Sequence, residues 1–189
     1  MRLPALLVSL SILGVAVPAP GGDGTPKLKD KSKPVRHQLE QAYAGLEAAI
    51  EKNDAEAILA FRHPDFGAID FEGRTFSAED MRNRTYQMVS LIQPPIDAGF
   101  ELGTIELNGA DEAVVTVRQS FSRMQTVAGK LRKLDTSVTQ DETWVRTAEG
   151  WRLRFVQNVH DMKWFVDGKR VEPGKPYDPD APAYAPAPE

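Results

Sequence analysis

The stretch of sequence that decides the fold is ETWVRTAEGWRL, residues 142–153. Apolar and polar residues alternate on both sides of a turn at residues 147–150, and this pattern is typical of two antiparallel strands joined as a hairpin. If the hairpin closes through that turn, Arg146 pairs with Trp151. The same register pairs Trp144 with Leu153, Glu142 with Phe155, and Gln140 with Gln157. We therefore expect these residues to share one face of a sheet.

Further strands are predicted on both sides of this hairpin. Alternating residues indicate long strands over 113–123, 134–146 and 151–159. A strand over 100–107 changes phase at Gly103, which predicts a bulge there. Asp167-Gly168 is a strong signal for a two-residue hairpin turn between strands over 164–166 and 169–171. The second half of the chain therefore reads as an antiparallel meander.

The segments before the meander are mostly helical. Apolar residues recur at helical spacing from Pro34 to Asn53, and Asp54 is placed to cap a short second helix that ends at residues 63–65. A short strand is predicted over 66–71.

The capping-box pair Ser77 and Asp80 then opens a third helix, which Pro94-Pro95 ends. Helices that come first and strands that come later predict an α+β fold rather than a doubly wound one.

Composition sets limits on function. The chain has 189 residues, of which 41% are hydrophobic and 26% charged, as expected for one soluble domain. It has no cysteine, which excludes disulfides, thiol nucleophiles and cysteine metal sites. Its net charge of −4 does not favour nucleic-acid binding.

The two ends of the chain differ from its middle. Residues 1–16 have a basic start, an apolar run and small residues at the end, which predicts a signal peptide cleaved near Ala16 or at the latest near residue 22. A linker over 17–33 follows. The domain is predicted over 34–172, and the Pro/Ala-rich residues 173–189 are predicted to be a disordered tail. We expect an exported protein, periplasmic or extracellular in a bacterium, with no membrane attachment after cleavage.

The order and spacing of these pieces resemble the nuclear transport factor 2-like superfamily, and the SnoaL-like group within it. The resemblance covers residues 35–159. It is carried by Asn53-Asp54, His63-Pro64-Asp65-Phe66, Glu72-Gly73-Arg74 and the hairpin over 142–153. It implies a cone, in which a strongly curved antiparallel sheet wraps against the helices around a pocket. Members include isomerases, dehydratases, epoxide hydrolases, cyclases, binders and dimerisation modules, so the fold alone does not give the function.

Polar residues in apolar strand phases indicate where a pocket would lie. Gln119 interrupts the phase of Val115, Val117 and Phe121, and polar groups placed in a core must find partners or line a cavity. The predicted pocket residues are Tyr43, Gln119, Gln140, Glu142, Trp144, Phe155 and Gln157. The alternative is that the strand phase slips at a bulge, so that these residues face water.

Asp70 is the candidate catalytic residue. It follows Ile69 in the first predicted strand, near the place where the resemblance puts the proton-transferring aspartate of steroid-isomerase-like members. A carboxylate in an apolar cavity has a raised pKa, which suits a general base. The oxyanion-binding tyrosine of those members falls near Leu46 here, so steroid-type isomerisation is not expected. The alternative is that Asp70 is a solvated residue before the Glu72-Gly73 turn.

Neither a metal nor a cofactor is expected. His63 and His160 lie beside acidic residues, but no three ligands share a recognised spacing. His63 is predicted to end a helix, and His160-Asp161 to mark a shift of strand phase. Three functions remain open: binding of a small apolar or amphipathic molecule, an isomerase, dehydratase or cyclase reaction with Asp70 as base, or a docking module such as a homodimer.

Overall fold

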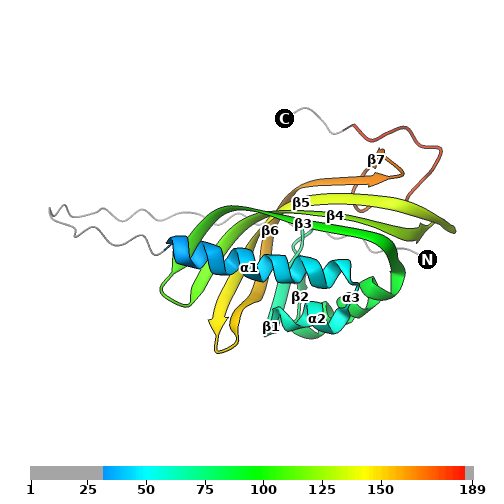
Figure 1. Cartoon of the computed structure of the whole chain (residues 1–189). Helices are drawn as coiled ribbons and strands as arrows, with labels where there is room; N and C mark the ends of the chain where they lie inside the picture. Colours follow the sequence, from blue (N-terminus) through cyan, green and yellow to red (C-terminus); the bar gives the residue numbers. More distant parts are fainter. Residues whose placement is uncertain (1–31, 186–189) are drawn as a thin grey trace, which may run out of the picture.

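Three helices pack on one face of a curved seven-stranded sheet in the computed structural model, which describes residues 32–185 (Figure 1). The helices are α1 (Ser32–Glu51), α2 (Ala55–Ala60) and α3 (Ala78–Leu91). The strands are β1 (Arg62–Ile69), β2 (Thr75–Phe76), β3 (Ile92–Asn108), β4 (Glu112–Val127), β5 (Lys130–Thr147), β6 (Gly150–Val166) and β7 (Lys169–Val171). The predicted α+β class is confirmed.

The sheet is mostly antiparallel, with one parallel pairing. Its strand order is β2-β1-β6-β5-β4-β3, and β7 also pairs with β6. β1 runs parallel to β6, whereas every other pairing is antiparallel. The sequence analysis expected a wholly antiparallel sheet. The parallel pair was not predicted because β1 and β6 are separated by residues 70–149, and no pattern of neighbouring residues indicates a contact over that distance in sequence.

Local capping signals were read correctly. The Asp54 side chain accepts a hydrogen bond from the Ala57 N–H at 3.0 Å and caps α2. Ser77 and Asp80 form the reciprocal capping box of α3, with the Asp80 N–H 3.2 Å from the Ser77 hydroxyl and the Ser77 N–H 2.9 Å from Asp80 Oδ2. These contacts depend only on residues three apart, which explains why the sequence alone predicts them.

The edges of several elements differ from the prediction. β1 begins at Arg62, so His63 lies in a strand rather than at the end of a helix. β4 and β5 reach a tight turn at Ala128-Gly129, whose φ angles of 49° and 75° match the hairpin type that favours glycine. The sequence analysis ended these strands early because the residues next to this turn are largely polar. The predicted turn at Asp167-Gly168 is confirmed, with φ angles of 52° and 78°.

The register predicted for the hairpin over residues 142–153 is confirmed only near its turn. Arg146 pairs with Trp151 and Trp144 with Leu153, as predicted. Beyond them, Thr143 pairs with Phe155, Glu142 with Val156 and Asp141 with Gln157. The predicted pairs of Glu142 with Phe155 and of Gln140 with Gln157 are therefore wrong. Arg154 is an extra residue in β6, and one extra residue reverses the face of every side chain that follows.

Two more register shifts follow in β6. They lie where Asn158 and Asp161 adopt left-handed φ angles of 53° and 52°. The second confirms the phase change predicted at His160-Asp161. β3 also shifts register, between Leu102 and Ile105, which confirms the bulge predicted at Gly103. These bulges bend the long strands so that the sheet curves around the helices.

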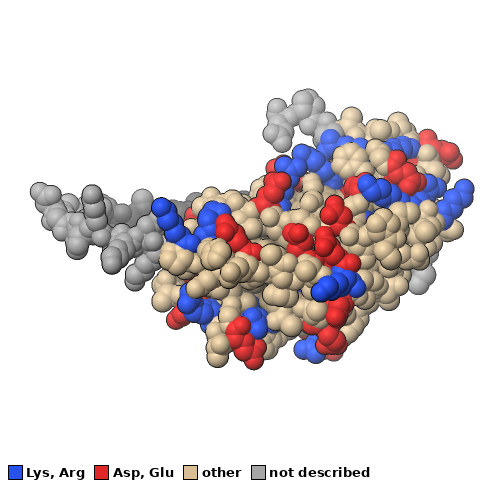
Figure 2. Space-filling view, viewed as in Figure 1, with Lys and Arg blue, Asp and Glu red and all other residues tan. Residues whose placement is uncertain are grey.

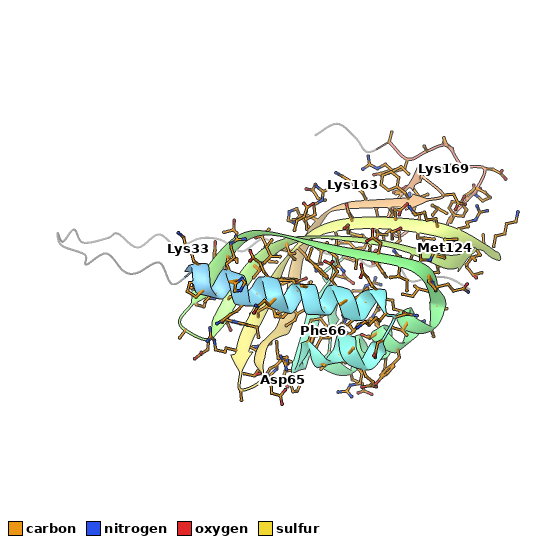
Figure 3. All side chains as sticks on the ribbon, viewed as in Figure 1. Lys33, Asp65, Phe66, Met124, Lys163 and Lys169 are labelled. Carbon is orange, nitrogen blue, oxygen red and sulfur yellow. The ribbon has the colours of Figure 1, made fainter. Side chains whose placement is uncertain are left out.

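The core lies between α1 and one end of the long strands. Side chains fill the space between α1 and the sheet (Figure 3). The buried core residues on these elements include Leu39, Tyr43, Leu46, Ala113, Val115, Val117, Trp144, Trp151 and Leu153. On the face seen in Figure 2, acidic and basic side chains are interspersed over the surface.

The predicted domain limits compare with the structure only in part. The predicted signal peptide over 1–16 and the linker up to residue 31 lie outside the described residues. α1 begins at Ser32, two positions before the predicted start of the domain, and β7 ends at Val171. No helix within residues 32–185 is long and apolar enough to cross a membrane.

Candidate functional site

The face of the sheet that packs on α1, called the inner face, has a covered half and an open half. In the covered half, Ala113, Val115 and Val117 of β4 have no exposed surface. In the same phase of β4, Gln119 and Phe121 are only half-buried. The open half is defined here by six partly exposed residues, Gln119, Phe121, Arg123, Thr136, Val138 and Trp164.

A buried polar network lies at the centre of the covered half. The Tyr43 hydroxyl of α1 donates to Glu142 Oε2 at 2.8 Å, and the Trp144 indole N–H donates to that hydroxyl at 2.8 Å. The Gln140 amide donates to Glu142 Oε1 at 2.6 Å. The Trp144 N–H also lies 3.3 Å from Glu142 Oε2. Four of the seven predicted pocket residues are thus brought together, in hydrogen bonds to one another.

Burial dominates the electrostatics of this network. Glu142 is only 2% exposed, and burial raises the pKa of its carboxyl group, although the three donors and the charge of Arg62 act in the opposite direction. Burial and the nearby Glu142 carboxylate raise the pKa of Tyr43. Both oxygens of Glu142 are already bonded to protein donors. The network therefore ties α1 to β5 rather than presenting a free carboxylate.

Arg62 is a member of this region that the sequence analysis missed. Its guanidinium donates to the Met81 carbonyl at 3.1 Å and to the Thr85 hydroxyl, and it stacks 4.6 Å from the centre of the Phe66 ring. Burial lowers the pKa of Arg62 to about 10, opposed by the negative charge of Glu142. The residue was overlooked because the short second helix was predicted to continue to residues 63–65, whereas β1 begins at Arg62.

Phe155 and Gln157 do not lie with the other predicted pocket residues. They pair with Thr143 and Asp141, which point away from the inner face because Gln140, Glu142 and Trp144 point toward it. A Cβ atom on Gly67 of β1 would lie 3.2 Å from the Phe155 ring, so this ring packs against the neighbouring strand. The bulge at Arg154 therefore places Phe155 and Gln157 on the opposite face of the sheet from the predicted pocket.

Asp70 occupies a turn directly after β1. Its Oδ1 accepts hydrogen bonds from the Glu72 N–H at 2.9 Å and the Arg74 N–H at 3.1 Å, and its Oδ2 lies 3.6 Å from Arg74 Nε. Its side chain is 19% exposed, so it is not the freely solvated residue of the alternative. No hydrogen bond among the described residues joins Asp70 to the Glu142 network.

Arg123 is the charged residue of the open half, and sequence analysis did not single it out. It shares the phase of Val117 and Phe121 along β4, which was the available signal. Its guanidinium stacks 4.6 Å from the centre of the Phe121 ring. Burial lowers the pKa of Arg123 to about 10.

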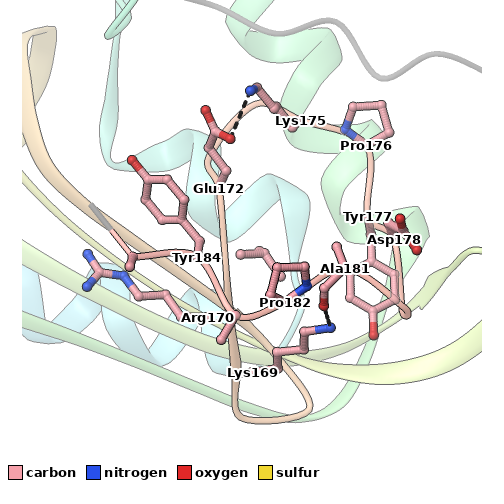
Figure 4. A pocket seen from close by; sticks show the side chains of 13 residues that line it. Lys169, Arg170, Glu172, Lys175, Pro176, Tyr177, Asp178, Ala181, Pro182 and Tyr184 are labelled. Carbon is pink, nitrogen blue, oxygen red and sulfur yellow. Dashed lines mark hydrogen bonds and ion pairs between the residues drawn. The ribbon is translucent and has the colours of Figure 1, made fainter. Parts of the chain in front are cut away.

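A cavity of about 370 Å³ lies between β7, which pairs with the last residues of β6, and the residues that follow β7 (Figure 4). Lys169 donates to the carbonyl groups of Pro179 and Ala181, and the Tyr184 N–H donates to the Arg170 carbonyl at 3.0 Å. Pro179, Ala181 and Tyr184 thus contact β7. Residues 186–189 lie outside the described range, and the disordered tail over 173–189 stays a prediction.

Structures of known proteins resemble this arrangement. A candidate scytalone dehydratase from Novosphingobium aromaticivorans matches with a TM-score of 0.58 and 11% identity, over 78% of this chain and 95% of that one. A candidate dehydratase of the nuclear transport factor 2-like family from Streptomyces avermitilis matches with a TM-score of 0.50 and 14% identity, over 66% and 95%. The chain has the nuclear transport factor 2-like fold.

Other comparisons add the following. A conserved protein from Planctomyces limnophilus shares the nuclear transport factor 2-like arrangement with a TM-score of 0.55 and 15% identity, over 68% of this chain and 98% of that one. No family model matches the sequence, and no curated protein does. At these identities the likeness shows the nuclear transport factor 2-like fold alone, and membership of the SnoaL-like group stays a prediction.

The covered half and the open half of the inner face differ in whether their polar groups are free to bind another molecule. In the covered half every polar group of the network is bonded and buried, so its role is to hold the helix on the sheet. In the open half the amide of Gln119, the hydroxyl of Thr136 and the guanidinium of Arg123 lie among apolar side chains, and all three side chains are partly exposed. Within residues 32–185, no group of three histidine, aspartate or glutamate side chains is placed to hold a metal ion.

Proposed function

We propose that the protein binds a small, partly apolar molecule on the open half of the inner face. The observation that carries the proposal is the change of burial along a single strand phase. Val115 and Val117 are sealed beneath α1, while Gln119 and Phe121 continue the same phase and stay partly exposed. Ligand sites are concave and mostly apolar with a few polar groups, and the uncovered inner face of a curved sheet fits that description.

The chemistry of the open half supports an amphipathic ligand. Phe121, Val138 and Trp164 supply apolar surface, and such surface binds when it leaves water. Gln119 and Thr136 supply hydrogen-bonding groups that orient a ligand. Two of the similar structures are described as candidate dehydratases, which act on small molecules, and this agrees with small-molecule binding.

The other functions have less support. A general-base role for Asp70 needs a carboxylate that faces a substrate, whereas Oδ1 of Asp70 is committed to two backbone N–H groups of its own turn. A homodimer or docking role has no specific observation in its favour. Export, with residues 1–16 as signal peptide, is part of the proposal and rests on the sequence alone.

The proposal is tested with N-phenyl-1-naphthylamine, a neutral apolar dye whose fluorescence rises when it leaves water. We expect one saturable site per chain. Val138→Gln in the open half is expected to weaken binding about tenfold, since it replaces apolar contact by a polar group. The matched control is Val145→Gln on the opposite face of the same strand, which leaves the affinity unchanged.

Two results would argue against a site in this place. The first is the absence of saturable dye binding to the folded wild-type protein. The second is an equal loss of affinity in the Val138→Gln and Val145→Gln variants, because this would report general destabilisation rather than a site on the inner face.

A further inference from the structure

The open half contains a guanidinium that lacks a negative partner. Arg123 is partly buried, and it donates from one terminal nitrogen, Nη1, to the Thr136 hydroxyl at 3.1 Å and to the Phe121 carbonyl at 3.4 Å. No acidic side chain among residues 32–185 forms an ion pair with it. Its Nε and Nη2 atoms have no hydrogen-bond partner within that range either.

The acids nearest in sequence and space are committed elsewhere. Asp135 acts on Arg123 through its charge, but it lies on the opposite face of β5 and pairs with Lys133 at 3.0 Å. Glu142 is the acid of the inner face, and it lies in the covered half opposite Val115, bonded to its own donors. No acid of the described chain therefore meets the free side of this guanidinium.

The surroundings of Arg123 hold it in place. Its planar group stacks on the Phe121 ring, and Thr136 opposite Phe121 fixes Nη1. The ring contact and the two Nη1 hydrogen bonds limit the movement of the guanidinium, and its remaining N–H donors, on Nε and Nη2, have the spacing that matches two oxygens of an oxyanion. Trp164 lies directly opposite Thr136 and adds a second aromatic ring to the same patch.

A partly buried cation is destabilised when it lacks a direct ion pair, and Asp135 acts on Arg123 only through its charge, without an ion pair. We infer that Arg123 binds the anionic head of the ligand, so that the ligand class is an organic anion with an apolar body. The carboxylate or sulfonate accepts hydrogen bonds from Nε and Nη2 of Arg123, while the apolar body lies against Phe121, Val138 and Trp164. This inference rests on the proposed binding function and specifies the ligand for the same site.

The test uses two dyes that differ by one group. N-phenyl-1-naphthylamine is neutral, and 8-anilino-1-naphthalenesulfonate is the same ring system with a sulfonate. We expect the sulfonate to bind the wild-type protein about tenfold more tightly than the neutral dye, and Arg123→Gln to remove that preference. Arg123→Lys keeps the charge but not the fork, and is expected to retain only part of it.

Arg118→Gln is the matched control. Arg118 is exposed on the opposite face of the same strand, so its substitution changes the net charge equally without touching the open half. We expect the preference for the sulfonate to survive in this variant. Far-UV circular dichroism and urea unfolding of Arg123→Gln that match wild type show that the variant is folded, so that a lost preference for the sulfonate reports the missing guanidinium.

Each outcome separates the inference from the function on which it rests. If both dyes bind the wild type equally, or if Arg123→Gln and Arg118→Gln lower sulfonate binding alike, the anion inference is overturned while small-molecule binding stands. If neither dye binds the folded wild type, the proposed function fails and the inference fails with it.

Discussion

Tyr43→Phe tests how much the buried network contributes to stability. The substitution removes only the hydroxyl, which donates to Glu142 at 2.8 Å and accepts from Trp144 at 2.8 Å. The ring and its packing against Phe100 and Trp144, at 5.2 and 4.8 Å between ring centres, are kept. Any loss of stability therefore comes from hydrogen bonding.

The magnitude follows from the burial of the partners. A hydrogen bond to a charged group contributes about 1.5–3 kcal/mol when both groups are buried. The Trp144 N–H keeps a longer contact of 3.3 Å with Glu142, which limits the second loss. We expect Tyr43→Phe to lower the free energy of unfolding by about 2–3 kcal/mol. This corresponds to a fall in Tm of roughly 5–10 °C.

Tyr86→Phe is the matched control. Tyr86 also donates to a glutamate, Glu56, at 2.5 Å, but it is 41% exposed. Water replaces that bond, so its loss costs about 0.5 kcal/mol or less. The assay is urea unfolding of the purified wild type and both variants, followed by far-UV circular dichroism. If the two substitutions cost the same within about 0.5 kcal/mol, the network is not the anchor of α1 that we describe.

Two further predictions concern single carboxylates. Burial raises the pKa of Glu142 above its ordinary value of 4.5. Between pH 4.5 and the folded pKa, the folded chain therefore holds a proton that the unfolded chain has lost. The stability that this carboxyl group contributes is fully present below pH 4.5 and is lost as the pH rises through the folded pKa. Relative to Glu142→Gln, which cannot ionise, the wild type is therefore expected to lose about 1.4 kcal/mol for each unit by which the pKa is raised, and unfolding free energies that stay in step from pH 4 to pH 7 would contradict this. At Asp70, the alanine variant is expected to cost about 1–2 kcal/mol, because the N–H groups of Glu72 and Arg74 lose their acceptor. Asp70→Asn keeps an acceptor oxygen and is expected to cost about half as much or less in the same urea assay; equal losses would show that the turn does not depend on these bonds.

Tyr43, Gln140, Glu142 and Trp144 were predicted from the sequence to line a pocket. The structure joins them in one buried hydrogen-bonded network, and their role in ligand binding stays a prediction. Three of them alternate along one strand, so a period of two residues places them on one face without any knowledge of the fold.

Other assignments depended on contacts that no local pattern reports. The sequence analysis paired Glu142 with Phe155, but the extra residue Arg154 puts Val156 opposite Glu142 instead. Arg62 was not singled out, since the partners that bury it, Met81 and Thr85, lie on α3. The position of Arg123 in the open half depends on the pairing of β4 with β5, which brings Thr136 to it.

By itself, the sequence determined the α+β class, the capped helices, the bulge at Gly103 and the turn at Asp167-Gly168. These features arise from neighbouring residues, because caps, turns and alternation are interactions over a few positions. Only the tertiary structure decided the parallel pairing of β1 with β6, the bulges of β6 at Arg154 and Asn158, and the point along β4 where α1 stops covering the sheet. A bulge forms where the curvature imposed by the whole sheet outweighs one lost ladder contact, and that balance belongs to all the packed elements together.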